Sequence, residues 1–251
     1  MRILLLSDIH SNLEALEACL AAAPAHDTVV NLGDIVGYGA SPNEVTVRSR
    51  ELGGTLVRGN HDKVVAGLEQ VENFNPAAGM AALWNRSQLT SENLEWLKQL
   101  PEGPILAPGL PGIQFVHGAP QDEDQYVVNL EDAVPSLLSS EVSITFFGHT
   151  HVQGTFSLRG GLGEAVHPEY ASVGNKETAE FKLQSGVHYM VNPGSVGQPR
   201  DGDWRAAFAT FDPEARTVTF YRVPYDLRGA QERILAANLP QRLATRLAAG
   251  R

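Results

Sequence analysis

Short apolar runs, each ended by a polar or glycine-rich turn, recur along this chain and are typical of buried β-strands. The clearest predicted strands span residues 2–6, 28–32, 55–57, 113–116, 143–147 and 189–191. The segments between the first three have the pattern of helices. Strands that alternate with helices predict β–α–β units, and therefore a sheet that is at least partly parallel.

The first two helical segments carry start signals. Ser11 and Glu14 have the spacing of a capping box, in which each side chain bonds the other residue's backbone N–H. Ser41 is followed by Pro42, which suits the first helical position, and by Glu44 at the same capping spacing. We therefore expect a helix to begin directly after each of the first two strands.

Three further patterns follow. Residues 63–100 are helical in pattern, and we interpret them as a lid-like helical insertion near the active site. Residues 206–211 and 217–223 alternate as strands do and predict a hairpin. From residue 226 onward the pattern predicts two amphipathic helices.

Composition narrows the class of protein. With 251 residues, of which 43% are hydrophobic and 19% charged, the chain can bury a full core as one α/β domain spanning residues 1–251. The apolar stretch at the amino terminus is too short for a signal sequence or a membrane span. The single cysteine, Cys19, excludes an intramolecular disulfide. We expect a cytoplasmic protein with no membrane partner.

The charge balance limits the partners. The formal net charge is −10 and Lys and Arg do not cluster, which argues against an extended nucleic-acid surface. A small anionic substrate remains compatible with this charge, because bound divalent cations would make one pocket locally positive. The sequence leaves the oligomeric state open.

Potential metal ligands follow five of the predicted strands. The segments are Asp8-Ile9-His10, Gly33-Asp34, Gly59-Asn60-His61-Asp62, His117-Gly118 and Gly148-His149-Thr150-His151. The carboxyl ends of parallel strands meet at one edge of a sheet, so we expect these groups to be neighbours. Their chemistry suits Mn, Fe, Zn, Ni or Co better than calcium. Two such ions about 3.5–4 Å apart need a bridging carboxylate, and Asp34 is the natural candidate.

These five segments, in this order, resemble the signature of the calcineurin-like metallophosphoesterase superfamily. Together with residues 192–197, Asn-Pro-Gly-Ser-Val-Gly, they make the chain similar to the bacterial YfcE-type phosphodiesterases. The resemblance implies a layered sandwich of mixed β-sheets flanked by helices. It also implies hydrolysis of a small phosphoester, a phosphodiester or a nucleotide, by a bridging hydroxide held between two divalent transition-metal ions.

The resemblance also assigns roles to the strand-end residues. It implies that Asp34 bridges two ions. The other ligands are Asp8, His10 and His151 for one ion and Asn60, His117 and His149 for the other. It further implies that His61 is a general acid or a transition-state stabiliser at the leaving-group oxygen rather than a ligand.

One position departs from the pattern of the related protein phosphatases. Many of them place an aspartate three residues after the bridging aspartate to orient the catalytic histidine, whereas Gly37 stands there in this chain. Asp62 is a candidate to replace that aspartate. The departure weakens a protein-phosphatase reading and favours small phosphodiesters or nucleotides.

Three residues are candidates for substrate contact. Tyr38 and Phe74 are placed to line the approach to the site, although buried aromatic side chains commonly serve packing. Arg200 could contact a substrate phosphate, but a surface salt bridge with Asp201 or Asp203 is the simpler interpretation.

The remaining histidines and one serine receive no chemical role. His26, His167 and His188 lack a motif and are interpreted as structural or solvent-facing. Ser195 is not set in the Gly-x-Ser-x-Gly elbow of a nucleophilic serine, which argues against acyl transfer.

Two other functions stay open. The chain could keep its metals as a scaffold and bind a partner, although the intact His61 favours catalysis. A metallonuclease is compatible with two metals, but the acidic balance and the lack of an appended DNA-binding region favour a small substrate.

Overall fold

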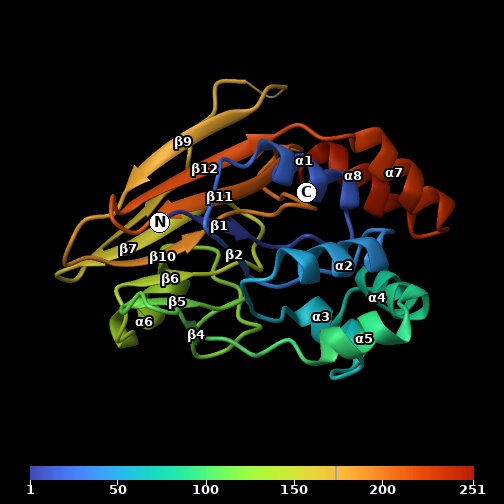
Figure 1. Cartoon of the computed structure of the whole chain (residues 1–251), viewed down its shortest axis with the longest axis horizontal. Helices are drawn as coiled ribbons and strands as arrows, with labels where there is room; N and C mark the ends of the chain where they lie inside the picture. The colour runs from blue at the N-terminus through green and yellow to red at the C-terminus, as the bar shows by residue number, and fades with distance from the viewer. Residues whose placement is uncertain (173) are drawn as a thin grey trace.

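The computed structural model describes residues 1–172 and 174–251, and in these residues two β-sheets pack face to face with helices on their outer faces (Figure 1). Buried apolar side chains fill the space between the sheets and the spaces beneath the helices on either side. This arrangement confirms the predicted α/β sandwich of mixed sheets flanked by helices.

The first sheet is parallel on one side and antiparallel on the other. Its strand order is β3 (Thr55–Leu56), β2 (Thr28–Asn31), β1 (Ile3–Leu6), β11 (Ala206–Asp212), β12 (Thr217–Val223) and β9 (Glu177–Lys182). Strands β1, β2 and β3 run parallel to one another, and β11, β12 and β9 continue the sheet in antiparallel pairs. The predicted hairpin is therefore β11 and β12.

The second sheet is also mixed. Its strand order is β4 (Ile105–Leu106), β5 (Ile113–Phe115), β6 (Ile144–Phe146), β10 (His188–Asn192), β7 (Gly154–Arg159) and β8 (Leu162–Val166). Strands β5, β6 and β10 are parallel. Strand β4 pairs antiparallel with β5, β7 with β10, and β8 with β7. Each sheet thus contributes parallel strands whose carboxyl ends can deliver side chains to a shared edge.

Side chains along β1 point alternately to the two faces of its sheet, so one set packs against the second sheet and the other against the helices. Ile3 and Leu5 lie in the core between the sheets, whereas Leu4 and Leu6 lie in the core beneath the helices. These four side chains are at most 2% exposed. Burying each one contributes about 1.5–3 kcal/mol to folding, and a strand buried on both faces reads as a continuous apolar run.

Most of the helices share one apolar core with the outer face of the first sheet. They are α1 (Leu13–Ala22), α2 (Pro42–Leu52), α3 (Asn60–Ala66), α4 (Pro76–Gln88), α5 (Ser91–Lys98), α7 (Leu227–Ala236) and α8 (Gln241–Ala249). Helix α6 (Leu130–Ser139) covers the second sheet, and a short 3₁₀ helix, η1 (Val71–Asn73), precedes α4. The predicted helical pattern of residues 63–100 and the two terminal helices are observed. No helix within residues 1–172 or 174–251 has both the length and the apolar character needed to cross a membrane.

The structure corrects the predicted helix starts. Helix α1 is capped by Asn12, whose Oδ1 accepts a hydrogen bond from Ala15 N at 3.1 Å. The hydroxyl of Ser11 instead donates to Asn85 Oδ1 at 2.6 Å. Ser41 precedes α2 as predicted, but its side chain makes no capping hydrogen bond within the described residues. At Ser11 the capping-box spacing misleads because a tertiary hydrogen bond takes the hydroxyl, whereas at Ser41 no such contact replaces the cap.

Candidate metal centre

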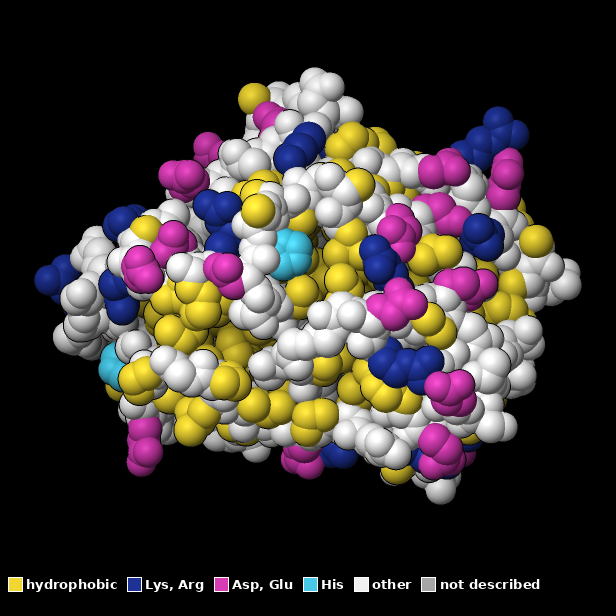
Figure 2. All heavy atoms as spheres, in the orientation of Figure 1, with side chains coloured by type: hydrophobic (Ala, Val, Ile, Leu, Met, Phe, Trp, Pro, Cys, Tyr) yellow, Lys and Arg dark blue, Asp and Glu magenta, His cyan; other side chains and the backbone are white. Residues whose placement is uncertain are grey.

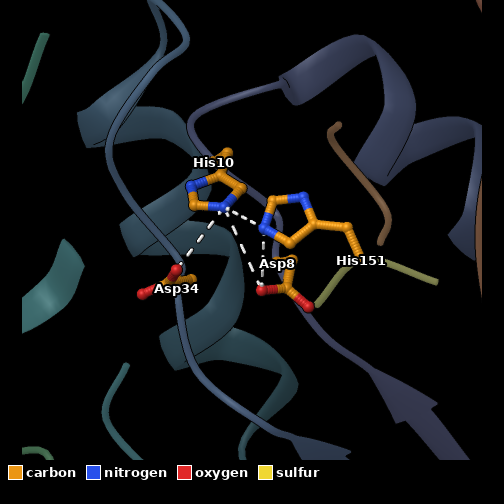
Figure 3. Close-up of side chains that lie close together, drawn as sticks. All are labelled: Asp8, His10, Asp34 and His151. Carbon is orange, nitrogen blue, oxygen red and sulfur yellow. Dashed lines mark hydrogen bonds and ion pairs between the residues drawn. The ribbon is translucent and has the colours of Figure 1, made fainter. Parts of the chain in front are cut away.

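The loops after β1, β2, β5 and β6 bring the predicted ligands together. In the described residues, two groups of buried side chains form, each with ligand atoms within 4.8 Å of one another. The first group is Asp8, His10, Asp34 and His151 (Figure 3), and the second is Asp34, His117 and His149. Asp34 belongs to both groups, as expected of a bridging ligand.

The Asp34 carboxylate stands between the two groups. Its Oδ2 lies 3.5 Å from His10 Nε2 and 3.5 Å from His117 Nε2. Its Oδ1 accepts a hydrogen bond from the backbone N–H of His61 at 2.8 Å. One oxygen of Asp34 therefore faces both groups while the other anchors the start of α3.

Each candidate histidine ligand is oriented by a backbone carbonyl. The pairs are His10 Nδ1 with Val36 O at 3.1 Å, His117 Nδ1 with Leu32 O at 2.8 Å, His151 Nδ1 with Gln198 O at 2.6 Å and His149 Nε2 with Asp124 O at 3.0 Å. Because a carbonyl oxygen can only accept, the ring nitrogen in each pair must donate. This second bond fixes the tautomer and turns the other nitrogen toward the centre.

The nitrogens that face the centre need a cation. His10 Nε2 and His151 Nε2 are 3.1 Å apart, and His149 Nδ1 and His117 Nε2 are 3.0 Å apart. In the first pair both rings already donate through Nδ1, so two lone pairs point at each other when the rings are neutral. A metal ion is the electron-pair acceptor that this arrangement fits.

Unpartnered oxygen atoms support the same fit. Asp8 Oδ2 and Asn60 Oδ1 are buried and have no hydrogen-bond partner within the described residues. A buried polar atom without a partner costs about 1–3 kcal/mol, so such atoms usually await a ligand or an ion. Asn60 begins α3 and lines the same cleft as His149, as its predicted ligand role requires.

The backbone at the candidate ligands adopts an unusual conformation. Positive φ angles of 53°, 48°, 55°, 67° and 62° occur at Asp8, His10, Asp34, His149 and His151. Such left-handed conformations cost non-glycine residues of order 1 kcal/mol each and concentrate at functional sites. Hydrogen bonds between loops hold them, among them His10 N to Asp34 O at 2.9 Å.

The Asp34 carboxylate can occupy its position because residue 59 is a glycine. A Cβ atom at Gly59 would lie 2.1 Å from Asp34 Oδ1 and 2.4 Å from Asp34 N. No side chain fits in that space, so Gly59 permits the loop after β3 to approach the loop after β2.

The two buried carboxylates, Asp8 and Asp34, have very different pKa values. Burial, with a further contribution from the Asp34 charge, raises the pKa of Asp8 to about 7. Burial acts in the same direction on Asp34, but His117, His61 and His10 hold the pKa of Asp34 well below its usual range. Asp34 is therefore the permanently charged member of the pair.

The imidazoles also differ from one another. Burial lowers the pKa values of His10 and His151 well below the usual range and that of His149 to about 3, so these rings are neutral near pH 7. Burial acts to lower the pKa of His117 too, but the Asp34 and Asp8 carboxylates raise it to about 10. The proton on His117 occupies a position that a metal ion would take.

His61 lies beside the candidate ligands rather than among them. Its ring packs against His10, Tyr38 and Phe74, with centroid distances of 4.8, 4.4 and 4.4 Å. Burial, against the attraction of Asp34, lowers the pKa of His61 to about 4. A neutral ring at pH 7 still carries one N–H, which suits hydrogen bonding to a developing charge.

The structure corrects the suggestion that Asp62 orients His61. Asp62 Oδ2 accepts from Gly59 N at 3.0 Å and Oδ1 from Val36 N at 3.1 Å, so this carboxylate braces two loops. His61 Nδ1 is buried and has no hydrogen-bond partner in the described chain. A Cβ atom at Gly37 would lie 2.4 Å from that nitrogen, so the His61 ring itself fills the space of an orienting aspartate.

The predicted salt bridges of Arg200 do not form. Asp201 pairs with Arg222, and Asp203 pairs with Arg205 at 2.6 Å. Arg200 instead directs Nη2 toward the hydroxyl of Tyr38 at 3.3 Å. Its guanidinium therefore lies at the site, together with the predicted contacts Tyr38 and Phe74.

A cleft of about 280 Å³ leads to these groups. Its lining residues are Tyr38, Asn60, His61, Glu69, Asn73, Phe74, Asn75, Ala78, Asp124, Tyr126 and His149. Sequence analysis missed Tyr126, whose ring lies 3.8 Å from that of His149, because no motif surrounds it. The residues from η1 and α4 on this wall place the predicted insertion beside the site.

Sequence analysis also missed a buried lysine that supports the centre. Lys63 on α3 is 7% exposed and pairs with Glu69 at 3.1 Å, Glu123 at 3.1 Å and Asp124 at 2.5 Å. These contacts tie the helix that begins at Asn60 to the loop whose Asp124 carbonyl holds His149. Lys63 thus positions a ligand through the backbone rather than touching it.

Asn85 on α4 joins the loop after β1 to the loop after β2. Its Oδ1 accepts from Ser11 Oγ at 2.6 Å and from Gly37 N at 3.0 Å, and its Nδ2 donates to Gly39 O at 3.0 Å. The side chain is fully buried. Helix α4 therefore fixes the loops that carry His10 and Asp34.

We expect Asn85→Ala to destabilise the protein by about 2–4 kcal/mol, because several buried polar groups lose their partners. Urea unfolding of the metal-free protein would measure the loss. Asn73→Ala, at an exposed position of η1, is the control and should change stability by less than about 0.5 kcal/mol. Equal stability of the two variants would show that Asn85 does not hold the loops.

The sandwich fold and the buried carboxylate and imidazole groups together define a metallophosphoesterase. The sequence profile of the calcineurin-like phosphoesterase superfamily domain matches residues 1–216, so the chain belongs to that superfamily. It is a phosphoester hydrolase by class, and members of the superfamily depend on metal ions. The predicted family is thereby confirmed.

Known proteins resemble the chain over its full length. MJ0912 of Methanocaldococcus jannaschii is 36% identical, over 99% of this chain and 98% of that protein. The crystal structure of a metallophosphoesterase from Sphaerobacter thermophilus has 39% identity, covers 100% of both chains and gives a TM-score of 0.85. YfcE, a phosphoesterase from E. coli, is 20% identical over 84% of this chain and 88% of its own, with a TM-score of 0.39. That last likeness is too distant to add to the assignment.

Proposed function

We propose that this protein hydrolyses a small phosphoester, a phosphodiester or a nucleotide, at a centre of two divalent transition-metal ions. The observation that carries the proposal is the position of Asp34 Oδ2, 3.5 Å from a histidine nitrogen of each group. Two bound ions would supply an activated water and neutralise charge on the phosphoryl oxygens. Mn, Fe, Zn, Ni and Co all suit the nitrogen and oxygen ligands.

The residues of the chain divide the remaining work. Asp8, His10 and His151 would hold one ion, Asn60, His117 and His149 the other, and Asp34 both. His61 would donate its ring N–H to the leaving-group oxygen, because it borders the cleft beside His10. Tyr38 and Phe74 would exclude water from one side of the bound ester.

Removal of metal tests this function. We expect EDTA treatment to abolish hydrolysis of an aryl phosphodiester, and separate addition of Mn²⁺, Fe²⁺, Zn²⁺, Ni²⁺ or Co²⁺ to restore it to different extents. Full activity after chelation, with no metal left by elemental analysis, would overturn the proposal. Metal binding with no turnover of any small phosphoester would favour the alternative of a metal-binding scaffold.

The surface argues for a small substrate rather than a nucleic acid. On the face shown in Figure 2, Lys and Arg side chains are scattered among Asp and Glu rather than gathered in one stripe. A nucleic-acid backbone needs such a stripe. Metal-dependent cleavage of single-stranded or linear DNA, with negligible turnover of small diesters, would reverse this choice.

A further inference from the structure

Two arginine side chains lie over Tyr38, next to the candidate metal centre. The guanidinium carbons of Arg200 and Arg246 are 5.6 and 5.5 Å from the centroid of the Tyr38 ring. The same ring contacts His10 and His61, with centroid distances of 4.7 and 4.4 Å. The ring that both cations contact therefore also borders the candidate metal centre.

Neither arginine has an Asp or Glu partner in the described residues, although Arg246 Nε donates to the backbone oxygen of Arg251. The neighbouring acids Asp201 and Asp203 pair with Arg222 and Arg205 instead, and Arg200 Nε is buried without a hydrogen-bond partner within residues 1–172 and 174–251. The acidic side chains of the cleft, Glu69 and Asp124, pair with Lys63. Burial and the nearby charge of Arg200 lower the pKa of Arg246.

Two like charges that share one ring without a side-chain carboxylate between them are unfavourable, and a bound anion would reduce that cost. Simple packing does not explain the pair, because an aliphatic side chain could cover the Tyr38 ring without repulsion. The arrangement instead fits a phosphate, whose oxygens match the planar donors of guanidinium groups.

Helix α8 carries a second arginine toward the cleft. Arg242 lies four residues before Arg246, which places both on one face of the helix. Arg242 Nη2 donates to Asn75 Oδ1 at 2.9 Å, and Asn75 lines the cleft. Buried Leu243 and Leu247 anchor α8 to the rest of the fold. Helix α8 lies beyond residues 1–216, the part that the superfamily profile matches.

We propose that Arg200 and Arg246, with Arg242 at the rim, bind a second phosphate group of the substrate beside the phosphoester that is cleaved. The inference rests on the proposed hydrolytic function and narrows it. The substrate class is a phosphoester that carries a further phosphate, as a nucleoside diphosphate does, rather than a compound with a single phosphorus.

Two probes that differ by one phosphate test the proposal. AMP and α,β-methylene-ADP are titrated by calorimetry into the manganese-loaded protein at fixed free Mn²⁺, and both are measured as inhibitors of aryl phosphodiester hydrolysis. We expect the wild type to bind the diphosphate analogue about tenfold to hundredfold more tightly than AMP. In Arg246→Gln this preference should fall at least about tenfold, mainly through weaker binding of the analogue.

Controls separate the possible explanations. Arg228→Gln removes an exposed arginine of α7 that pairs with Glu232, and it should leave both dissociation constants unchanged. Unfolding temperatures confirm that each variant is folded, and Arg242→Gln provides a second test should Arg246→Gln fail to fold. A wild type that does not prefer the analogue, or variants that weaken both ligands equally, would overturn the inference. In either case an active wild type would leave the hydrolytic function intact, whereas a wild type without metal-dependent turnover would refute that function separately.

Discussion

Asp34→Asn is expected to lower kcat/KM for an aryl phosphodiester by roughly a thousandfold or more, since losing about 4 kcal/mol of transition-state stabilisation has that effect. The reason lies in its Oδ2, which is 3.5 Å from both His10 Nε2 and His117 Nε2. The asparagine side chain has one neutral oxygen, whereas the proposed bridge between two metal ions requires a negatively charged carboxylate. Elemental analysis should show fewer than two metal ions per chain.

The matched control is another aspartate that flanks β2. Asp27 precedes β2 at the end opposite to Asp34, is exposed, and accepts a hydrogen bond from Arg2 N at 2.7 Å. Asp27→Asn should keep both the metals and the turnover. If Asp34→Asn retained two ions and wild-type kcat/KM, the shared-ligand assignment would be wrong.

His61→Ala should behave differently, with kcat falling about 10²-fold to 10⁴-fold while both metal ions remain bound. His61 contacts the ring of His10 but is not part of either ligand group. Its effect should grow as the leaving group becomes poorer, because an alkoxide needs more help than a p-nitrophenolate. Turnover of aryl and alkyl esters of one phosphodiester series would measure this dependence.

His188→Ala supplies the comparison for this variant. His188 bonds Val142 O through Nδ1 at 3.0 Å, in keeping with the structural role predicted for it, and lies away from the cleft lining. Its replacement should not alter kcat. The proposed role of His61 would be contradicted if His61→Ala lost as much metal as Asp34→Asn. It would also be contradicted if the decrease in kcat were the same for good and poor leaving groups.

The residues gathered at the candidate centre could be predicted because the sheet topology largely determines which residues meet there. Asp8, Asp34, His117 and His149 follow apolar runs, and parallel strands carry whatever follows them to the same edge. Residue type then limits the chemistry to metal ligation. The sandwich could be named from the family resemblance, although strand pairing across the second sheet could not be derived from periodicity.

Other features could not be predicted because their signal is either weak or distant. Strand β8 is mostly exposed, and β9, with the sequence Glu-Thr-Ala-Glu-Phe-Lys at a sheet edge, is half charged, so neither has the pattern of a buried apolar strand. Helix α6 contains Pro135, which obscured its pattern. Asn85 and Arg246 act across long sequence separations, and nothing beside them in the sequence indicates the loops or rings they contact.

The left-handed backbone at Asp8, His10, Asp34, His149 and His151 has a consequence for how this protein can change. Glycine or asparagine would relax each of these positions, so folding alone would favour replacing the very residues that the chemistry requires. In these loops, substitutions that raise thermal stability are therefore expected to lower catalytic activity. Engineering for heat resistance should leave them untouched and look instead to the exposed edges of β8 and β9.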